Sequence, residues 1–135
     1  MRYFILPLLS LCLFVISACN TGNTAKAEPP TISINKPAEN TTYPLQDSVV
    51  GIDILVVAID DVEIKYVEYE IRNSANEVEF ASIQTNPSST TNDIRVYTEY
   101  KKFHPTHTGS FTIRALARDG LNQEGTDEQV FHISQ

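Results

Sequence analysis

The sequence predicts an all-β protein, a seven-stranded antiparallel β-sandwich that follows a cleaved export segment and a flexible linker. Two patterns support this prediction. Apolar and polar residues alternate along most of the chain after residue 30, and turn-forming residues interrupt the alternation every 8–15 residues. No stretch after residue 30 has a convincing helical period. We therefore expect three regions, an export segment at 1–18, a linker at 19–30 and one domain at 31–135.

The export segment contains 14 apolar residues and a single charge, Arg2. Its apolar run is shorter than the roughly 18–20 residues that a membrane-spanning helix needs, and it fits the central region of a signal peptide. The run ends in Ile16-Ser17-Ala18-Cys19, which resembles the lipobox of bacterial lipoproteins. The resemblance implies that a peptidase cuts before Cys19 and that the Cys19 thiol carries the lipid that anchors the protein to a membrane.

The alternative is an ordinary secretory signal with a chance cysteine. Cys12 leaves with the export segment, so Cys19 has no partner for an intramolecular disulfide, and a lipid anchor explains this lone thiol. The next residue is Asn20 rather than aspartate, which by the sorting rule of enteric Gram-negative bacteria favours the outer membrane. Residues 20–30 are polar and end in a diproline, and fully extended they reach at most about 36–40 Å.

The first three predicted strands are separated by different breakers. Residues 31–35 alternate and stop at a Lys-Pro pair, and a turn follows at residues 40–44. Residues 49–59 are the most apolar segment of the domain, which predicts a central strand buried on one face and partly covered on the other. Asp60 and the next aspartate end that strand. Residues 67–72 alternate regularly, as in a half-buried strand.

Four more strands are predicted after a turn at residues 73–76. The alternating residues of the fifth predicted strand are Ile94, Val96, Thr98 and Tyr100. Residues 84–93 and 101–108 are polar and predict loops. The last four strands are expected at 78–83, 94–100, 111–118 and 127–134.

Three segments of the domain resemble bacterial immunoglobulin-like (Ig-like) domains. They are PTISINKPAEN at 30–40, a strand junction with IDDV at 59–62 and VEY at 67–69, and GSFTIRALARDGLN at 109–122. The chain also resembles lipoproteins in which one Ig-like domain stands alone. The resemblance spans about residues 29–134 and implies an Ig-like sandwich. The chain has no tryptophan and no cysteine pair in the domain, which excludes the packing of antibody domains.

An Ig-like topology would gather acidic residues at the pole where the linker enters. Oxygen-rich clusters at this place bind Ca²⁺ in cadherin-like and some bacterial Ig-like domains. The resemblance therefore implies a possible calcium site. The alternative is that Asp60 and Asp119 cap turns through the nearby backbone. The candidate ligands are Asp60, Asp61, Asp119 and Glu124, with Glu63 and Asn122 beside them.

The segment KKFHPTHT at 101–108 is expected at the opposite pole. We interpret Phe103 as an exposed aromatic residue flanked by cations, suited to contact a protein partner or a glycan. His104 and His107 are three residues apart and could chelate Zn²⁺ or Cu²⁺. Pro105 between them and the lack of a third nearby ligand weaken that hypothesis, and a solvated loop is the alternative.

The charge and the motifs narrow the function. The net charge is −7, or −8 once Arg2 is removed, which argues against nucleic acid as a partner. No motif of a nucleophilic, phosphate-binding or zinc-dependent enzyme occurs, and the strand pairs Glu68/Glu70 and Glu77/Glu79 fit solvent-facing positions that protect a sheet edge. We therefore expect no enzyme.

The leading hypothesis is a membrane-anchored, non-catalytic binding or structural module of the cell envelope that contacts a protein or a glycan. One alternative is an accessory subunit of a larger envelope complex. Another is a metal-handling periplasmic lipoprotein that uses His104, His107 and His132.

Overall fold

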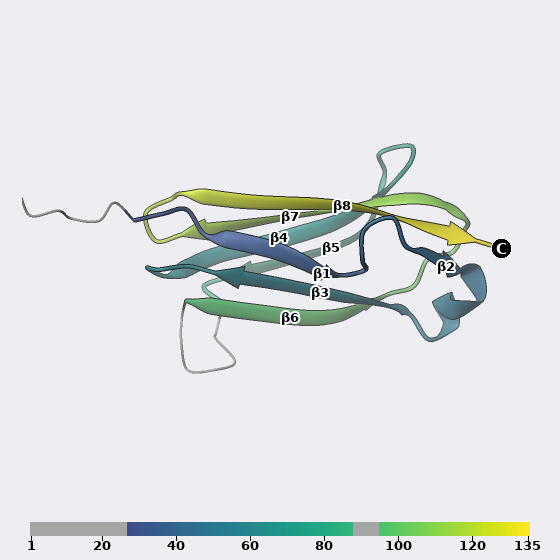
Figure 1. Ribbon diagram of the computed structural model, residues 1–135, viewed down its shortest axis with the longest axis horizontal. Helices are drawn as coiled ribbons and strands as arrows, with labels where there is room; N and C mark the ends of the chain where they lie inside the picture. Colours follow the sequence, from purple (N-terminus) through teal and green to yellow (C-terminus); the bar gives the residue numbers. More distant parts are fainter. Residues whose placement is uncertain (1–26, 88–94) are drawn as a thin grey trace, which may run out of the picture.

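The computed structural model describes residues 27–87 and 95–135, which form two β-sheets packed into an elongated sandwich (Figure 1). The chain enters the sandwich at one end of the long axis, and the C-terminus lies at the other end. The export segment, Cys19 and the segment 88–94 are outside the described residues. Within the described residues, no helix has the length and apolar character needed to cross a membrane.

The smaller sheet contains three antiparallel strands in the order β1 (Thr31–Lys36), β3 (Ile52–Ile59) and β6 (Val96–Phe103). β3 is the central strand, as its apolar composition predicts. Its residues up to Ala58 alternate between buried and half-buried positions, because one face packs on the core and the other is partly covered, and the last residue, Ile59, is exposed.

The larger sheet contains five strands in the order β2 (Thr42–Pro44), β8 (Glu124–Ser134), β7 (Gly109–Asp119), β4 (Ile64–Asn73) and β5 (Val78–Thr85). β4 lies between β5 and β7. The prediction that Glu68 and Glu70 protect a sheet edge is therefore wrong, because both residues sit on an internal strand.

The predicted count of seven antiparallel strands is wrong, because the described residues form eight. The additional strand is β2, in the segment predicted as a turn, and it pairs in parallel with β8. The segment predicted as a strand from residue 49 also divides. Leu45–Val49 form a 3₁₀ helix, η1, and Val49 is 85% exposed. β3 begins only after Gly51, whose φ of +85° favours glycine.

The core lies between the sheets and follows the predicted alternation on β1, β4 and β7. An aromatic cluster fills the half of the core that is farther from the entering chain. In it, Phe103 packs against Phe80, Phe111 and Phe131 at ring-centroid distances of 5.5–6.3 Å. The buried apolar side chains of β1, β4 and β7 are Ile32, Ile34, Ile64, Val67, Tyr69, Ile71, Phe111, Ile113, Ala115 and Ala117.

The odd-numbered residues of β6 face the core, whereas the sequence pattern predicts that the even-numbered residues do. Tyr97 and Phe103 are buried, whereas Thr98 and Tyr100 are exposed. The polar Glu99 therefore points inward. The sequence pattern predicts burial of Tyr100 because its ring is apolar. Its hydroxyl instead donates a hydrogen bond to the Asp53 carboxylate on the outer face of the smaller sheet.

The entering chain is fixed against the turn between β7 and β8. Gln123 Nε2 donates a hydrogen bond to the Ala27 carbonyl over 3.2 Å. Pro30 crosses β8 so closely at Gly125 that a Cβ atom there would lie 1.8 Å from the Pro30 carbonyl oxygen. The linker therefore joins the domain at the end that carries this turn.

Candidate binding groove on the larger sheet

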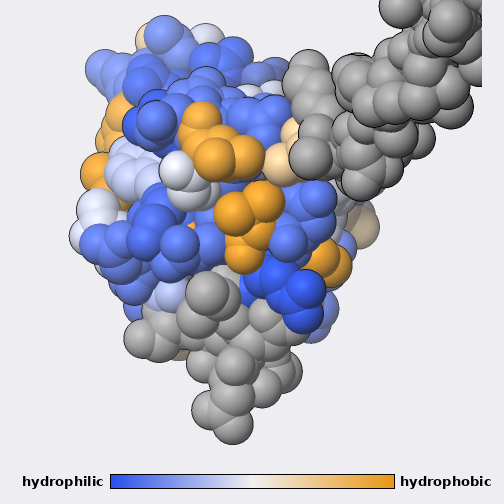
Figure 2. All heavy atoms as spheres, turned by 90° about the vertical axis from the view of Figure 1, so that its left-hand side faces the viewer, coloured by the Kyte–Doolittle hydropathy of each residue, from blue (hydrophilic) through white to orange (hydrophobic). Residues whose placement is uncertain are grey.

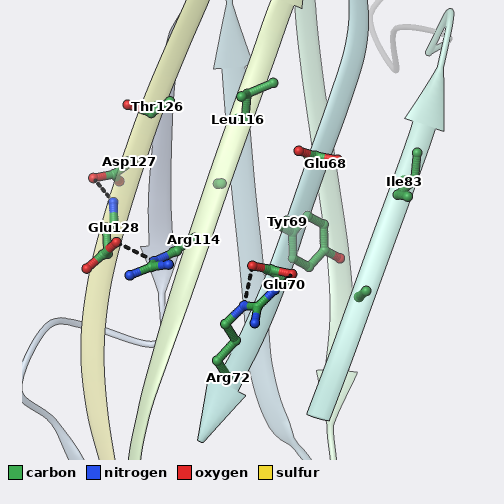
Figure 3. A pocket seen from close by; sticks show the side chains of 12 residues that line it. Glu68, Tyr69, Glu70, Arg72, Ile83, Arg114, Leu116, Thr126, Asp127 and Glu128 are labelled. Carbon is green, nitrogen blue, oxygen red and sulfur yellow. Dashed lines mark hydrogen bonds and ion pairs between the residues drawn. The ribbon is translucent and has the colours of Figure 1, made fainter. Parts of the chain in front are cut away.

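The outer face of the larger sheet carries a groove of about 760 Å³, which we call the outer groove (Figure 3). Outward-pointing side chains of β5, β4, β7 and β8 line it. The volume is in the range of about 300–1,000 Å³ that is usual for ligand sites. The strand register arranges these side chains in two parallel rows that cross the sheet.

The first row is partly apolar and consists of Ile83, Glu68, Leu116 and Thr126. Ile83 is 60% exposed, and Leu116 is half-buried. The Glu68 carboxylate between them accepts a hydrogen bond from the Tyr66 hydroxyl. The exposed Ile83 and the half-buried Leu116, on either side of Glu68, are apolar groups that a ligand can cover, and we call this row the apolar strip of the groove.

The second row is charged and consists of Ala81, Glu70, Arg114 and Glu128. Arg114 Nε donates to Glu128 Oε2 over 2.6 Å. Arg72 binds both oxygens of Glu70, at 2.5 and 3.0 Å. The hydrogen bonds from Arg72 lower the pKa of Glu70, and the charge of Arg114 adds to the effect. The groove therefore presents fixed charges of both signs beside an apolar strip.

None of the described residues that line the groove exposes an aromatic ring. Tyr69 lies along its floor, but its ring points between the sheets and the residue is 2% exposed. Tyr66 lies on the same outer face nearer the linker end, where the Arg118 guanidinium covers its ring at 5.5 Å.

The structure brings the predicted acidic residues to the linker end, which Figure 2 shows as a mainly hydrophilic surface with a few apolar groups. Asp60 Oδ2 accepts hydrogen bonds from the backbone N–H groups of Val62 and Glu63, at 3.3 and 2.9 Å. Asp60 Oδ1 is buried without a hydrogen-bond partner among the described residues. Asp60 thus caps the turn between β3 and β4.

Asp119 caps the turn between β7 and β8 in the same way. Its Oδ1 accepts from the N–H groups of Leu121 and Gln123, at 2.8 and 2.7 Å, and its Oδ2 accepts from Gln123 Nε2 at 3.0 Å. Glu124 instead pairs with Arg118 on the outer face of the sheet. Across residues 27–87 and 95–135, no three histidine, cysteine or acidic side chains are grouped so that they could hold a metal ion.

Phe103 differs from its prediction. It is the last residue of β6 rather than part of a polar loop, and it is 3% exposed in the aromatic cluster. The interpretation of Phe103 as an exposed contact residue is wrong, because β6 extends to this position and its inward phase places the ring in the core.

The histidines contact different partners. His104 Nδ1 lies 2.7 Å from the Ser48 carbonyl oxygen in η1. His107 stacks on Phe111 and reaches Glu79 of β5 with Nε2 at 3.2 Å. His132 Nδ1 lies 3.0 Å from Ser110 Oγ. Each ring is thus held by its own neighbours.

A polar cluster that the sequence pattern does not predict lies inside the sandwich, between β5 and β6. Glu99 Oε2 accepts hydrogen bonds from Tyr97 Oη at 2.7 Å and Ser82 Oγ at 3.1 Å, and Lys101 Nζ lies 3.2 Å from Oε1. The nearby Tyr69 hydroxyl is buried without a hydrogen-bond partner among the described residues. Burial raises the pKa of Tyr69 and of Tyr97, and for Tyr97 the bond to Glu99 adds to the effect.

The outer groove is not predicted by the sequence pattern either, although Glu68 and Glu70 lie on a solvent-facing surface as predicted. The period of two identifies outward positions within each strand. It does not identify which strands are neighbours, so it could not place Arg114 beside Glu70.

Comparisons with known proteins add a fold but no family. No family model matches the chain, and no curated protein matches it. CopC from Methylosinus trichosporium OB3b is a similar solved structure, with 10% identity over 78% of this chain and 93% of that chain and a TM-score of 0.51. Superoxide reductase (neelaredoxin) from Ignicoccus hospitalis matches at 10% identity over 80% of this chain and 82% of that chain, with a TM-score of 0.45. The likeness to CopC supports a β-sandwich fold.

Proposed function

We propose that this protein is a lipid-anchored, non-catalytic binding module of the bacterial cell envelope, and that a segment of another envelope protein occupies its outer groove. The observation that carries the proposal is the outer groove itself, an apolar strip flanked by fixed charges of both signs. Such a surface matches a polypeptide, whose side chains offer apolar groups and charges of both signs at short intervals.

A glycan fits the outer groove less well. Sugar rings stack on exposed aromatic faces, and the aromatic residue that lines the groove, Tyr69, keeps its ring between the sheets. Phe103, the aromatic residue that the sequence predicts as a contact for a protein or a glycan, is in the core. A protein partner therefore accounts better for the described surface than adhesion to a sugar does.

The strand order supports an Ig-like type of sandwich. In that fold the first, second and fifth strands share one sheet, and the third, sixth and seventh share the other. With β2 set aside as a short addition, β1, β3 and β6 correspond to the first group, and β4, β7 and β8 to the second. β5 extends the second sheet, as an additional edge strand does in variable-type domains.

The proposal includes a lipid anchor on Cys19, because the chain that follows Cys19 is held at one end of the domain. Ala27 is held at the turn between β7 and β8, so a lipid on Cys19 would place this end toward the membrane. Substitution of Cys19 by alanine is expected to release the protein from the membrane fraction, and globomycin is expected to block its processing. Unchanged partitioning into the detergent phase of the Cys19→Ala variant would disprove the anchor.

The groove is tested with a photo-reactive amino acid placed at Leu116 in growing cells. Thr98 is the matched control position, because it points outward from β6 on the other sheet. We expect an adduct with a second envelope protein at Leu116, identified by mass spectrometry, and none at Thr98.

Substitution of Leu116 by lysine adds a charge to the apolar strip and is expected to abolish binding of the identified partner. The Thr98→Lys variant adds the same charge to the opposite face and is expected to bind normally. Equal labelling at both positions, or adducts with a second copy of this chain alone, would disprove the proposed partner.

A further inference from the structure

The two sheets present four edge strands, β1, β6, β2 and β5, and natural sandwiches protect such edges against pairing with another strand. Side chains from β8 occupy the edge of β1, where Asp127 Oδ2 accepts from the Ile34 N–H at 2.8 Å and Gln129 Nε2 donates to the Ile34 carbonyl at 2.8 Å. β2 has only three residues and ends in Pro44. β6 carries Lys101 and Lys102. Three of the four edges are thus protected.

β5 is the exception over most of its length. A bulge opposite Arg72 and the charge of Glu79 protect the first two residues of β5. The remaining residues, Phe80–Thr85, contain no charge, no proline and no further bulge. Ile83 in this stretch is 60% exposed. Such an edge is suited to accept another strand.

The direction of the peptide groups of β5 follows from its pairing with β4. The Asn86 N–H donates to the Lys65 carbonyl at 2.7 Å, so the even-numbered residues of this stretch bond to β4. Because peptide groups alternate along a strand, those of Ala81, Ile83 and Thr85 point to the free edge. They have no backbone hydrogen-bond partner among those described within residues 27–87 and 95–135.

The free edge is self-complementary. When two β5 strands run antiparallel with Ser82 opposite its own copy, Ala81 faces Ile83 of the partner subunit on the outer side. Thr85 then faces the partner's Glu79. The two Glu79 residues lie at opposite ends of the pair, so no like charges oppose each other.

We propose that two copies of this chain associate through antiparallel pairing of their β5 strands, centred on Ser82. The two larger sheets then form one continuous ten-stranded sheet around a two-fold axis perpendicular to it. Each outer groove reaches β5, so the pairing joins the two grooves side by side, with Ala81 and Ile83 at the junction. This association does not depend on the partner proposed for the groove.

The register predicts one specific cross-link. Residues 82 of the two copies form a pair without mutual hydrogen bonds, with Cα atoms about 4.5 Å apart, which is within the range that a disulfide spans. In the full chain, expressed in cells and oxidised in the membrane, Ser82→Cys is expected to give about tenfold more covalent dimer than the Thr85→Cys control. The two residues 85 are separated by six residues along the paired strands, roughly 20 Å.

A second substitution tests the free backbone. Ala81→Pro removes an N–H that no strand within the described residues of the same copy uses, so proline is tolerated there on an edge strand. The Ser82→Cys, Ala81→Pro double variant is expected to lose the cross-link, and the Ser82→Cys, Ala81→Ser control is expected to keep it. Equal thermal melting midpoints of the two double variants would show that the loss does not come from unfolding.

Light scattering of the processed wild-type protein in non-ionic detergent provides an independent measurement. A protein mass twice that of the monomer supports the dimer, and Ile83→Lys is expected to return it to the monomer. A wild-type monomer at all concentrations up to about 500 μM would overturn the proposal, since that limit corresponds to an association of only about 4.5 kcal/mol. Equal cross-linking of Ser82→Cys and Thr85→Cys would overturn the register.

Discussion

Glu99 of β6 accepts a hydrogen bond from Ser82 of β5 over 3.1 Å, which joins the two sheets at edges that share no ladder. The Glu99 side chain is only 10% exposed and also receives bonds from Tyr97 and Lys101. A carboxylate in this position is stable only because these donors replace its water. The polar cluster therefore takes the place of apolar packing on this side of the sandwich.

Substitution of Glu99 by alanine is expected to lower the free energy of unfolding by about 2–3 kcal/mol, because it leaves buried hydroxyl groups without an acceptor. Glu39 is an exposed carboxylate, and its alanine variant is the matched control, expected to change stability by less than about 0.5 kcal/mol. Urea unfolding measures both. Equal effects of the two substitutions would contradict a structural role for Glu99.

The same residue predicts a pH dependence. Burial raises the pKa of Glu99, but the hydrogen bonds from Tyr97, Lys101 and Ser82 outweigh it, so the folded pKa lies below the ordinary value. Glu99 therefore stabilises the fold above the unfolded pKa of about 4.3 and loses this contribution as the pH falls through the folded pKa. The stability difference between wild type and Glu99→Gln is expected to shrink below pH ~4.3. A difference that grows on acidification would refute the assignment.

Asp119 holds the turn between β7 and β8 through both carboxylate oxygens. Asp119→Ala is expected to cost about 1–3 kcal/mol, since it removes a carboxylate that is 1% exposed and leaves the backbone N–H groups of Leu121 and Gln123 without their acceptor. Asp119→Asn keeps an acceptor for those groups and is expected to cost less. Thermal unfolding measures the order, and a larger loss for asparagine than for alanine would contradict the cap.

Calcium provides a test of the same end of the molecule. Because both Asp119 oxygens already accept hydrogen bonds, we expect equal melting midpoints in calcium and in chelator. A midpoint that rises with calcium would support the predicted site, with Asp60 Oδ1, which has no hydrogen-bond partner among the described residues, as its first ligand.

Gly125 lets the entering chain cross β8. Gly125→Ala would place a Cβ atom 1.8 Å from the Pro30 carbonyl oxygen, so the crossing chain must move. We expect a loss of about 1–3 kcal/mol from this overpacking. Gly120→Ala is the control, because its Cβ would meet Glu63 only at 3.6 Å. Scanning calorimetry of the two variants is decisive, and a Gly125→Ala protein as stable as Gly120→Ala would show that the crossing is loose.

His107 is expected to titrate above its ordinary pKa. The Thr108 carbonyl raises the pKa of His107 most, and the Glu79 carboxylate adds to the effect, while His107 lowers the pKa of Glu79 in return. A raised histidine pKa stabilises the fold fully below about pH 6.5, and this contribution disappears as the pH rises through the folded pKa. In NMR titrations, Glu79→Gln is expected to lower the His107 pKa, with Glu39→Gln as the unchanged control. An unaffected His107 would exclude the contact in solution.

The candidate sites show where sequence alone was insufficient. The pole that collects Asp60 and Asp119 was predicted correctly, because strand order fixes which turns share an end of a sandwich. The sequence is compatible with two roles for those carboxylates, metal binding and turn capping. The hydrogen bonds that they accept from backbone N–H groups support capping. For Phe103 the prediction failed, because the length and phase of β6 decide whether that ring is at the tip or in the core.

The sequence by itself determined the all-β class, the positions of seven of the eight strands and the inward residues of β1, β4 and β7, because alternation within a strand is a local property of the chain. Only the tertiary structure decided which strands are neighbours. It alone placed Arg114 beside Glu70 in the groove, turned Glu99 inward where Ser82 can bind it, and left β5 at a free edge. Each of these features depends on pairing between residues far apart in the sequence, and alternation carries no information about the partner of a strand.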